Sequence, residues 1–92
     1  MVRYEIRYHK DVIKKDLPNL KAAKLEKKAK ALVDLLGDDP FTTPPFYEQL
    51  VGDLEGYYSR RINHKHRLVY QVHEEEKILL ILSMWSHYEK NL

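Results

Sequence analysis

Apolar residues recur along the chain with different spacings, and each spacing predicts a different element. Residues 2–8 alternate apolar and charged side chains, a period of two that predicts a half-buried strand. From residue 9 the apolar side chains take helical spacing, and Pro18 is expected to close or kink this first helix. From Ala22 to Leu36 they recur at steps of three and four, which predicts a second helix that ends at Gly37 in a left-handed cap.

The second half of the chain has the pattern of extended structure. Residues 38–47 hold three prolines and two threonines and predict an ordered, non-helical crossing. Aromatic and β-branched residues dominate 57–62 and 66–72, and the short connection at 63–65 suits a hairpin. After a second turn at 73–76, residues 77–85 are nearly continuously apolar, as expected of a strand that is covered on both faces.

These elements predict an α+β fold with the order β-α-α-β-β-β. Two N-terminal helices are expected to pack on one face of a small, largely antiparallel four-stranded sheet. The length of 92 residues fits one domain spanning residues 1–92, because a chain of this size cannot build two independent cores.

Composition excludes several classes of protein. The chain has no cysteine, so it has no disulfide framework, no thiolate nucleophile and no zinc site built on cysteine. Its longest strongly apolar run, residues 78–82, spans five residues, whereas a membrane-spanning helix needs about 20. The first ten residues lack an apolar signal core, so we expect a cytoplasmic protein without a membrane segment.

The formal net charge of +2 is the sum of blocks of one sign. Residues 1–30 sum to +6, residues 31–55 to −6, residues 56–70 to +4 and the last 22 residues to −2. Segregated charge allows a nearly neutral protein to present a face that binds a polyanion. Lys21, Lys24 and Lys28 share one side of the second predicted helix, which is either an ordinary solvated face or a docking surface for a large RNA.

The predicted hairpin concentrates side chains that suit single-stranded RNA. Residues 56–70 contain four cations, two histidines and three tyrosines. Cations neutralise phosphates, and tyrosine rings stack on unpaired bases. A solvated edge strand that its charges protect from aggregation has the same composition, so the residues alone leave both interpretations open.

Three residues offer the groups of a metal-free ribonuclease, which needs a base for the 2′-hydroxyl, a cation for the phosphorane and an acid for the leaving 5′-oxygen. Glu48, Arg67 and His87 supply one of each, and histidine suits the acid because its ordinary pKa lies near neutrality. Spacing alone is weak evidence, since such residues are usually solvated surface groups.

A metal site is not expected. His64 and His66 lack a carboxylate or cysteine at ligand spacing, so neither a metal nor another cofactor is expected.

A longer set of motifs runs in one order between residues 48 and 88. It consists of Glu-x-Leu, Leu-x-Gly, an aromatic pair, Ser-Arg-Arg-Ile, His-Arg-Leu-Val-Tyr and a final His-Tyr. Their order and gaps closely resemble the YoeB/Txe branch of the RelE-like toxins of bacterial type II toxin–antitoxin systems. Several motifs in register are far more specific than any one of them.

The resemblance implies a ribosome-dependent mRNA interferase, a metal-independent endoribonuclease that cuts mRNA in the ribosomal A site and inhibits translation. It implies Glu48 as general base, Arg67 as stabiliser of the transition-state phosphate and His87 as general acid. It also implies that Arg61 contacts a phosphate and that Tyr88 positions the scissile nucleotide. With the hairpin composition, the expected RNA-binding residues are Tyr58, Arg60, Arg61, Lys65, His66 and Tyr88.

The partner implied by the resemblance is a small antitoxin of the YefM/Phd type, whose disordered C-terminal segment wraps the toxin and blocks the site. The complex would repress its own operon, so the toxin would meet operator DNA only indirectly, through the antitoxin. Ribosomal RNA and mRNA are the other implied partners, and a homodimer is left open.

Two positions depart from better-known family members. Val51 stands where those members have a lysine, and Lys65 replaces a carboxylate seen in some of them.

Two other functions remain open. One alternative is a ParE-like toxin that binds DNA gyrase and is not a nuclease. Glu48 and His87 argue against it, because gyrase binding does not need a general acid and a general base. The other is a non-catalytic module that binds RNA or the ribosome, for which the hairpin tyrosines and arginines would suffice.

Overall fold

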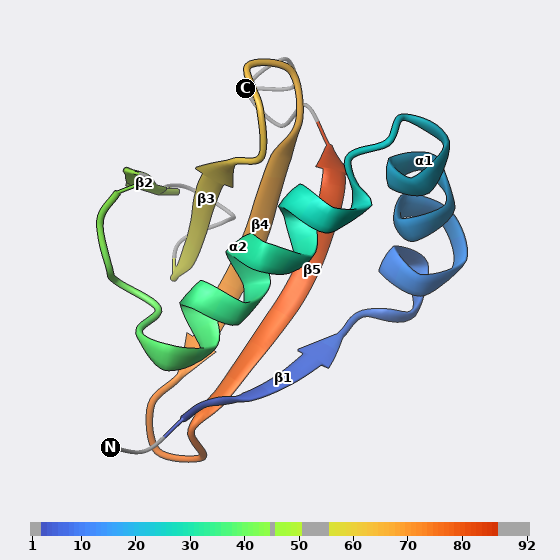
Figure 1. Ribbon diagram of the computed structural model, residues 1–92. Helices are drawn as coiled ribbons and strands as arrows, with labels where there is room; N and C mark the ends of the chain where they lie inside the picture. Colours follow the sequence, from blue (N-terminus) through green and yellow to red (C-terminus); the bar gives the residue numbers. More distant parts are fainter. Residues whose placement is uncertain (1–2, 45, 51–55, 87–92) are drawn as a thin grey trace.

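The strands form one five-stranded sheet in the order β1-β5-β4-β3-β2 (Figure 1). The computed structural model describes residues 3–44, 46–50 and 56–86. Along the chain, the elements are β1 (Glu5–Tyr8), a π-helical segment η1 (Val12–Asp16), α1 (Leu17–Ala22), α2 (Glu26–Asp38), β2 (Tyr47–Gln49), β3 (Tyr57–Arg61), β4 (Arg67–His73) and β5 (Ile78–Ser86). β1 runs parallel to β5, and the other neighbouring pairs are antiparallel.

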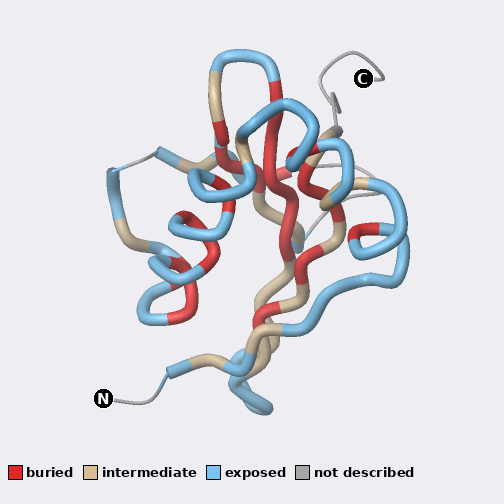
Figure 2. The backbone as a smooth tube through the Cα atoms, turned by 45° about the vertical axis from the view of Figure 1, so that its right-hand side comes forward, coloured by how far each residue is buried: buried red, intermediate tan, exposed pale blue. Residues whose placement is uncertain are grey.

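The helices cover one face of this sheet, and α2 lies across β3, β4 and β5 (Figure 1). Alternate side chains of the central strands, such as Leu68 and Tyr70 of β4, meet the helical layer. The other members of this buried cluster are Val12, Leu20, Ala29, Leu32, Val33, Leu36, Ile62, Leu79, Ile81 and Met84. Figure 2 shows buried positions along the central strands and on one side of the helices. The predicted α+β class, with its helices on one face, is therefore confirmed.

The sheet has one strand more than the four predicted, because residues 47–49 form β2 at its edge. The strand has three residues and follows a proline-rich segment, so it is too short to show an alternating pattern in the sequence. Its antiparallel pairing with β3 places Glu48 directly opposite Ser59. Glu48 therefore lies in a strand, and its position is fixed by the register of the sheet.

The segment before α1 is wound as a π-helix. The Leu17 N–H bonds the Val12 carbonyl five residues earlier, and Pro18 follows in the first turn of α1, where a missing N–H costs no helical bond. The chain thus stays helical through Pro18, where the sequence predicted an end or a kink. At the end of η1, Asp16 accepts the backbone N–H of Met84 at 3.0 Å, which joins this segment to β5.

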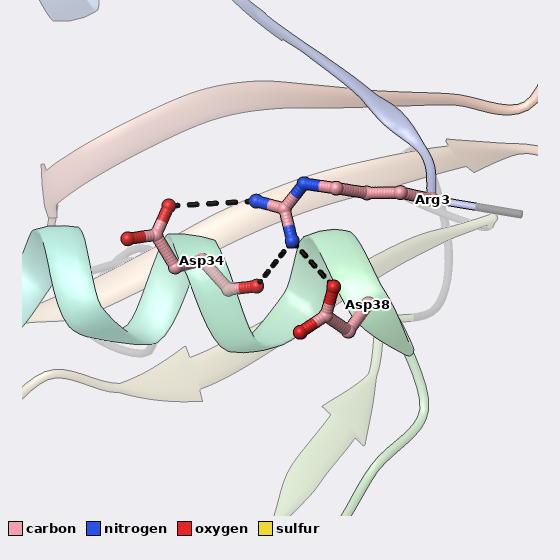
Figure 3. Close-up of polar contacts among 3 residues, drawn as sticks. All are labelled: Arg3, Asp34 and Asp38. Atoms are coloured by element: carbon pink, nitrogen blue, oxygen red, sulfur yellow. Dashed lines mark hydrogen bonds and ion pairs between the residues drawn. The ribbon is translucent and has the colours of Figure 1, made fainter. Parts of the chain in front are cut away.

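Arg3 joins the start of the chain to the end of α2 (Figure 3). Its guanidinium donates to the Asp34 carbonyl at 3.2 Å and to the Asp38 carboxylate. A cation is favourable here, because the C-terminal end of a helix carries partial negative charge. A Cβ at Gly37 would lie 2.8 Å from this guanidinium. Gly37 therefore makes room for Arg3 inside α2, and the predicted cap at Gly37 is wrong, since the helix continues to Asp38.

Arg60 has an exposed fraction of 0% and holds the crossing before β2 against the sheet. Its guanidinium donates to the carbonyls of Thr42 at 2.6 Å and Pro40 at 2.9 Å, and its Nε donates to the Tyr70 hydroxyl at 3.0 Å. Burial raises the pKa of the Tyr70 hydroxyl, which in turn donates to the Pro40 carbonyl at 2.8 Å. A buried cation needs such partners. Arg60 therefore has a structural role in this fold, and its expected contact with RNA stays a prediction.

The first prediction concerns the stability that Arg60 provides. We expect Arg60→Ala to lower the free energy of unfolding by about 3 kcal/mol or more, because it leaves buried carbonyl groups without their donor. Arg61→Ala, one residue further along β3 and exposed, is the matched control and should change stability by less than about 0.5 kcal/mol. Denaturant unfolding of both variants measures the difference. Equal stabilities would contradict the structural role of Arg60.

Candidate functional site

Glu48 and Arg67 form an ion pair on the face of the sheet that the helices leave uncovered. Arg67 Nη1 donates to Glu48 Oε1 at 2.9 Å and to Ser59 Oγ at 3.1 Å. Since Leu68 points into the helical layer, its neighbour Arg67 points to the opposite face. The three side chains come from three adjacent strands, β2, β3 and β4. The structure therefore brings together two of the three predicted catalytic residues.

The partners in this contact differ in their exposure. The exposed fraction of the side chain is 66% for Glu48 and 10% for Arg67, and Ser59 is 2% exposed. The guanidinium is thus fixed at the surface of the sheet while the carboxylate reaches solvent. An ion pair with one solvated partner is typically worth about 0–1 kcal/mol.

Further cations lie at the turn that joins β3 and β4. Arg61 lies directly opposite Arg67 in the strand pairing, and like charges at opposed positions are unfavourable unless an anion binds between them. Asn63 Oδ1 accepts the backbone N–H groups of Lys65 and His66 at 2.9 and 2.7 Å and so shapes the turn. Arg61 and Lys65 are exposed. They remain candidates for contacts with phosphate.

His66 does not lie on an exposed RNA-binding face. Its exposed fraction is 6%, and its ring stacks on Trp85 with the centroids 3.8 Å apart and the planes at 17°. Trp85 also packs against the core cluster. The stack holds the start of β4 against the end of β5. His66 therefore packs within the protein, and its expected contact with RNA stays a prediction.

Tyr58 lies on the helical side of the sheet, away from the ion pair. Strand alternation points it opposite to its neighbour Ser59. Its ring contacts those of Phe41, Tyr47 and Tyr70, with centroid separations of 5.3, 5.7 and 5.6 Å. Tyr58 is half-buried in this aromatic cluster. Its expected contact with RNA stays a prediction, and any such contact would lie on the opposite face of the sheet from Arg67.

β5 ends at the ion pair, because Ser86 lies opposite Arg67 in the strand pairing. Two register shifts between Arg67 and Tyr70 carry β5 to this point. His87, Tyr88 and Val51 lie outside the described residues. Within the described ranges, no group of three or more histidine, aspartate or glutamate side chains is placed to hold a metal ion, and no helix is long and apolar enough to cross a membrane.

The family model of the YoeB-like toxin of bacterial type II toxin–antitoxin systems matches residues 17–88. The chain belongs to this family. It is 42% identical over 67 residues to Toxin YoeB of Synechocystis sp., a match that covers 73% of this chain and 76% of the relative. The relationship therefore extends through the helices, the hairpin and the predicted C-terminal site residues.

Solved structures share the fold of this family member over nearly its whole length. The YoeB/ParE toxin from Agrobacterium tumefaciens superposes with a TM-score of 0.81 at 28% identity, covering 91% of this chain and 99% of that chain. A chain of the YoeB-YefM complex from Staphylococcus aureus gives a TM-score of 0.76 at 32% identity, covering 94% and 99%. These likenesses confirm the RelE-like α+β fold that the motifs predicted.

Ser59 is a site residue that the sequence reasoning missed. It belongs to the Ser-Arg-Arg-Ile motif, but a serine beside two arginines has no obvious role in a linear sequence. Its place beside Arg67 and Glu48 depends on β2, the strand that was not predicted.

The second prediction measures the strength of the ion pair. In a double-mutant cycle of Glu48→Ala and Arg67→Ala, we expect a coupling energy of about 0.5–1 kcal/mol, because the carboxylate is solvated. Denaturant unfolding of the wild type, both single variants and the double variant provides the four free energies. A coupling above about 2 kcal/mol would contradict the view that the pair opens easily.

Proposed function

We propose that this YoeB-like toxin is a ribosome-dependent mRNA interferase, an endoribonuclease that cleaves mRNA in the ribosomal A site and inhibits translation without a metal. The single observation that carries the proposal is the 2.9 Å contact between Glu48 and Arg67 on the uncovered face of the sheet. A carboxylate and a guanidinium held together there are two of the three groups that the reaction needs. Membership of the toxin family supports the same function.

The proposed reaction is attack of the ribose 2′-oxygen on the adjacent phosphorus. Glu48 accepts the proton of the 2′-hydroxyl, and Arg67 stabilises the extra negative charge of the phosphorane. His87 donates a proton to the 5′-oxygen as its bond to phosphorus breaks. The products are a 2′,3′-cyclic phosphate and a 5′-hydroxyl. His87 follows Ser86 in the chain, and Ser86 lies opposite Arg67, which supports this assignment.

The remaining RNA contacts are assigned to exposed cations and to one aromatic residue. Arg61 and Lys65 are exposed at the β3–β4 turn, where they would bind phosphates on either side of the scissile bond. Tyr88, next to His87 in the sequence, would position the scissile nucleotide by stacking. Lys65 would add a positive charge beside Arg67 and so strengthen the binding of phosphate.

The helical layer offers a second cationic surface, for ribosomal RNA. Eight lysines of the helical layer are exposed, namely Lys10, Lys14, Lys15, Lys21, Lys24, Lys27, Lys28 and Lys30. Three of them, Lys21, Lys24 and Lys27, line one hollow and are called the lysine face. Several of the eight lie at the N-terminal end of α2, where the helix dipole disfavours cations. None of them forms an ion pair with another residue in the described ranges. An external polyanion would supply the missing counter-charge, and ribosomal RNA is such a polyanion.

The proposed regulatory partner is an antitoxin of the YefM/Phd type. Support comes from the Staphylococcus aureus relative, which was solved as a YoeB-YefM complex. By covering the ion pair of Glu48 and Arg67, an antitoxin segment would exclude RNA. Operator DNA would then be met only indirectly, through the antitoxin, and a homodimer of the toxin is compatible with this scheme.

The third prediction tests the nuclease directly. Toeprinting of a translated message should show cleavage in the A site with the wild type, whereas Glu48→Gln, Arg67→Ala and His87→Ala should each lower the cleavage rate by about 100-fold or more. The matched control is His9→Ala, which replaces an exposed histidine near the start of the chain, far in sequence from the three site residues. We expect this variant to keep full activity. Wild-type rates in all three site variants would refute the assignment. Growth arrest with intact mRNA would favour the gyrase-binding alternative.

The fourth prediction tests the lysine face. Lys21, Lys24 and Lys27 line one shallow hollow together with Glu26, and replacing the three lysines with alanine removes three positive charges. The slope of log affinity for ribosomes against log salt concentration should fall by about 2–3, since each phosphate contact contributes about 0.9. Sedimentation at several salt concentrations measures it. Lys77→Ala, which removes a lysine paired with Glu74, should leave the slope unchanged. An unchanged slope in the triple variant would contradict the proposal.

A further inference from the structure

We infer that Tyr57 and Gln71 form a subsite for one unpaired base of the mRNA strand, in which the Tyr57 ring stacks on the base and the Gln71 amide selects adenine. The inference rests on the proposed function, because it names what binds beside the ion pair of Glu48 and Arg67. Both residues of the subsite lie outside the proposed catalytic set and would contact the substrate directly.

The two side chains lie side by side on the face of the sheet that holds the ion pair. Tyr57 precedes Ser59 by two residues on β3, so strand alternation points both side chains to the same face. Gln71 follows Arg67 by four residues on β4 and shares its face for the same reason. The strand pairing places Tyr57 directly opposite Gln71, and opposed side chains begin about 5 Å apart. A single base can therefore contact both.

The subsite lies within reach of a strand that is bound at the ion pair. A strand rises by about 3.4 Å per residue, so Tyr57 lies about 7 Å along β3 from Ser59, the residue that Glu48 opposes. By the same measure, Gln71 lies about 14 Å along β4 from Arg67. When the scissile phosphate is at Arg67 and its ribose is at Glu48, a neighbouring base can therefore reach the subsite.

The two tyrosines at the start of β3 differ in their ring contacts. Tyr58 packs against three other rings on the helical side of the sheet. Tyr57 is partly exposed, and among the residues that the structure describes its ring contacts no other ring. Proteins commonly hold unpaired bases by stacking them on such a ring. Of the two, Tyr57 is therefore the tyrosine that fits a base beside the ion pair.

A neighbour on the same strand orients the Gln71 amide. Gln71 Oε1 accepts a hydrogen bond from His73 Nε2 at 3.1 Å, since an amide oxygen can only accept. This oxygen has a second lone pair, and the amide nitrogen bonds no other residue in the described part of the chain. A donor and an acceptor side by side match N7 and the N6 amino group of adenine. The amide therefore favours adenine over the other bases.

The first experiment measures binding without cleavage. Trinucleotides of adenine and of uracil with 2′-O-methyl groups, which lack the attacking hydroxyl, are titrated into the full chain and followed by NMR. The adenine trinucleotide should shift the signals of the Tyr57 ring and the Gln71 amide and bind about tenfold more tightly than the uracil one. Y57A should weaken adenine binding about tenfold, and Q71A should abolish the preference. Wild-type affinity in Y57A, or an unchanged preference in Q71A, would overturn the inference.

Matched variants separate stacking and base selection from general effects on the sheet. Tyr8 is a strand tyrosine, 37% exposed, that lines a hollow on the helical side with Leu17 and Met84. Gln49 is an exposed glutamine that alternation points away from the face of Glu48. Y8A and Q49A should bind the adenine trinucleotide like the wild type, and Y57F, which keeps the ring, should do the same. The spectra also show whether each variant is folded, and an equal loss in Y8A or Y57F would contradict stacking on Tyr57.

Cleavage on the ribosome tests the same preference. Messages that differ in one base of the A-site codon are compared by toeprinting, at each codon position in turn. At one position the wild type should cut about tenfold faster when the base is adenine, and Q71A should cut the four messages at similar rates. Equal rates for all messages with the wild type would overturn the selection of adenine. If the wild type cuts no message, the proposed function falls, whereas the binding experiment still decides whether the subsite exists.

Discussion

The architecture of this toxin depends on a buried guanidinium whose partners are backbone carbonyls and a hydroxyl. Arg60 reaches across the sheet to the carbonyls of Pro40 and Thr42, in a segment that has no regular secondary structure to hold it. Burying a cation is costly unless its donors are used. The crossing therefore has to lie where these carbonyls meet the guanidinium, and this fixes the point from which the chain enters β2. The position of Glu48 follows from that entry point.

The adjacent residues Ser59 and Arg60 of β3 thus contribute to opposite faces of the sheet. Because side chains alternate along β3, Ser59 and Arg60 point to opposite faces. Arg60 anchors the crossing within the helical layer, while Ser59 touches Arg67 on the uncovered face. The same alternation separates Leu68, which is part of the core, from Arg67. The residues that stabilise the fold and those proposed to act on RNA are interleaved one by one, so a shift of one position in register would exchange their environments.

The long elements were predictable from the sequence because each has a strong period of its own. The hairpin and the last strand follow from β-branched and aromatic runs bounded by turns, and α2 follows from its apolar stripe. β2 escaped prediction because its three residues gain their structure from pairing with β3. The burial of Arg60 could not be predicted from the sequence for a related reason. Its carbonyl partners lie 18 and 20 residues away, and no local pattern separates it from exposed Arg61. Both the formation of β2 and the burial of Arg60 therefore depend on contacts between residues that are far apart in the sequence.

The charge blocks of the sequence are balanced differently at the two ends of α2. At the C-terminal end, Arg3 neutralises Asp34 and Asp38, so part of the acidic block is balanced within the chain. At the N-terminal end, Lys27 and Lys28 oppose the helix dipole, and neither forms an ion pair with a described residue, although Glu26 lies in the same turn. An arrangement that costs stability in the isolated chain becomes favourable once phosphates surround it. Glu48 fits the same logic, since its solvated carboxylate balances the Arg67 guanidinium in the isolated chain, as a phosphate would in the proposed complex with RNA.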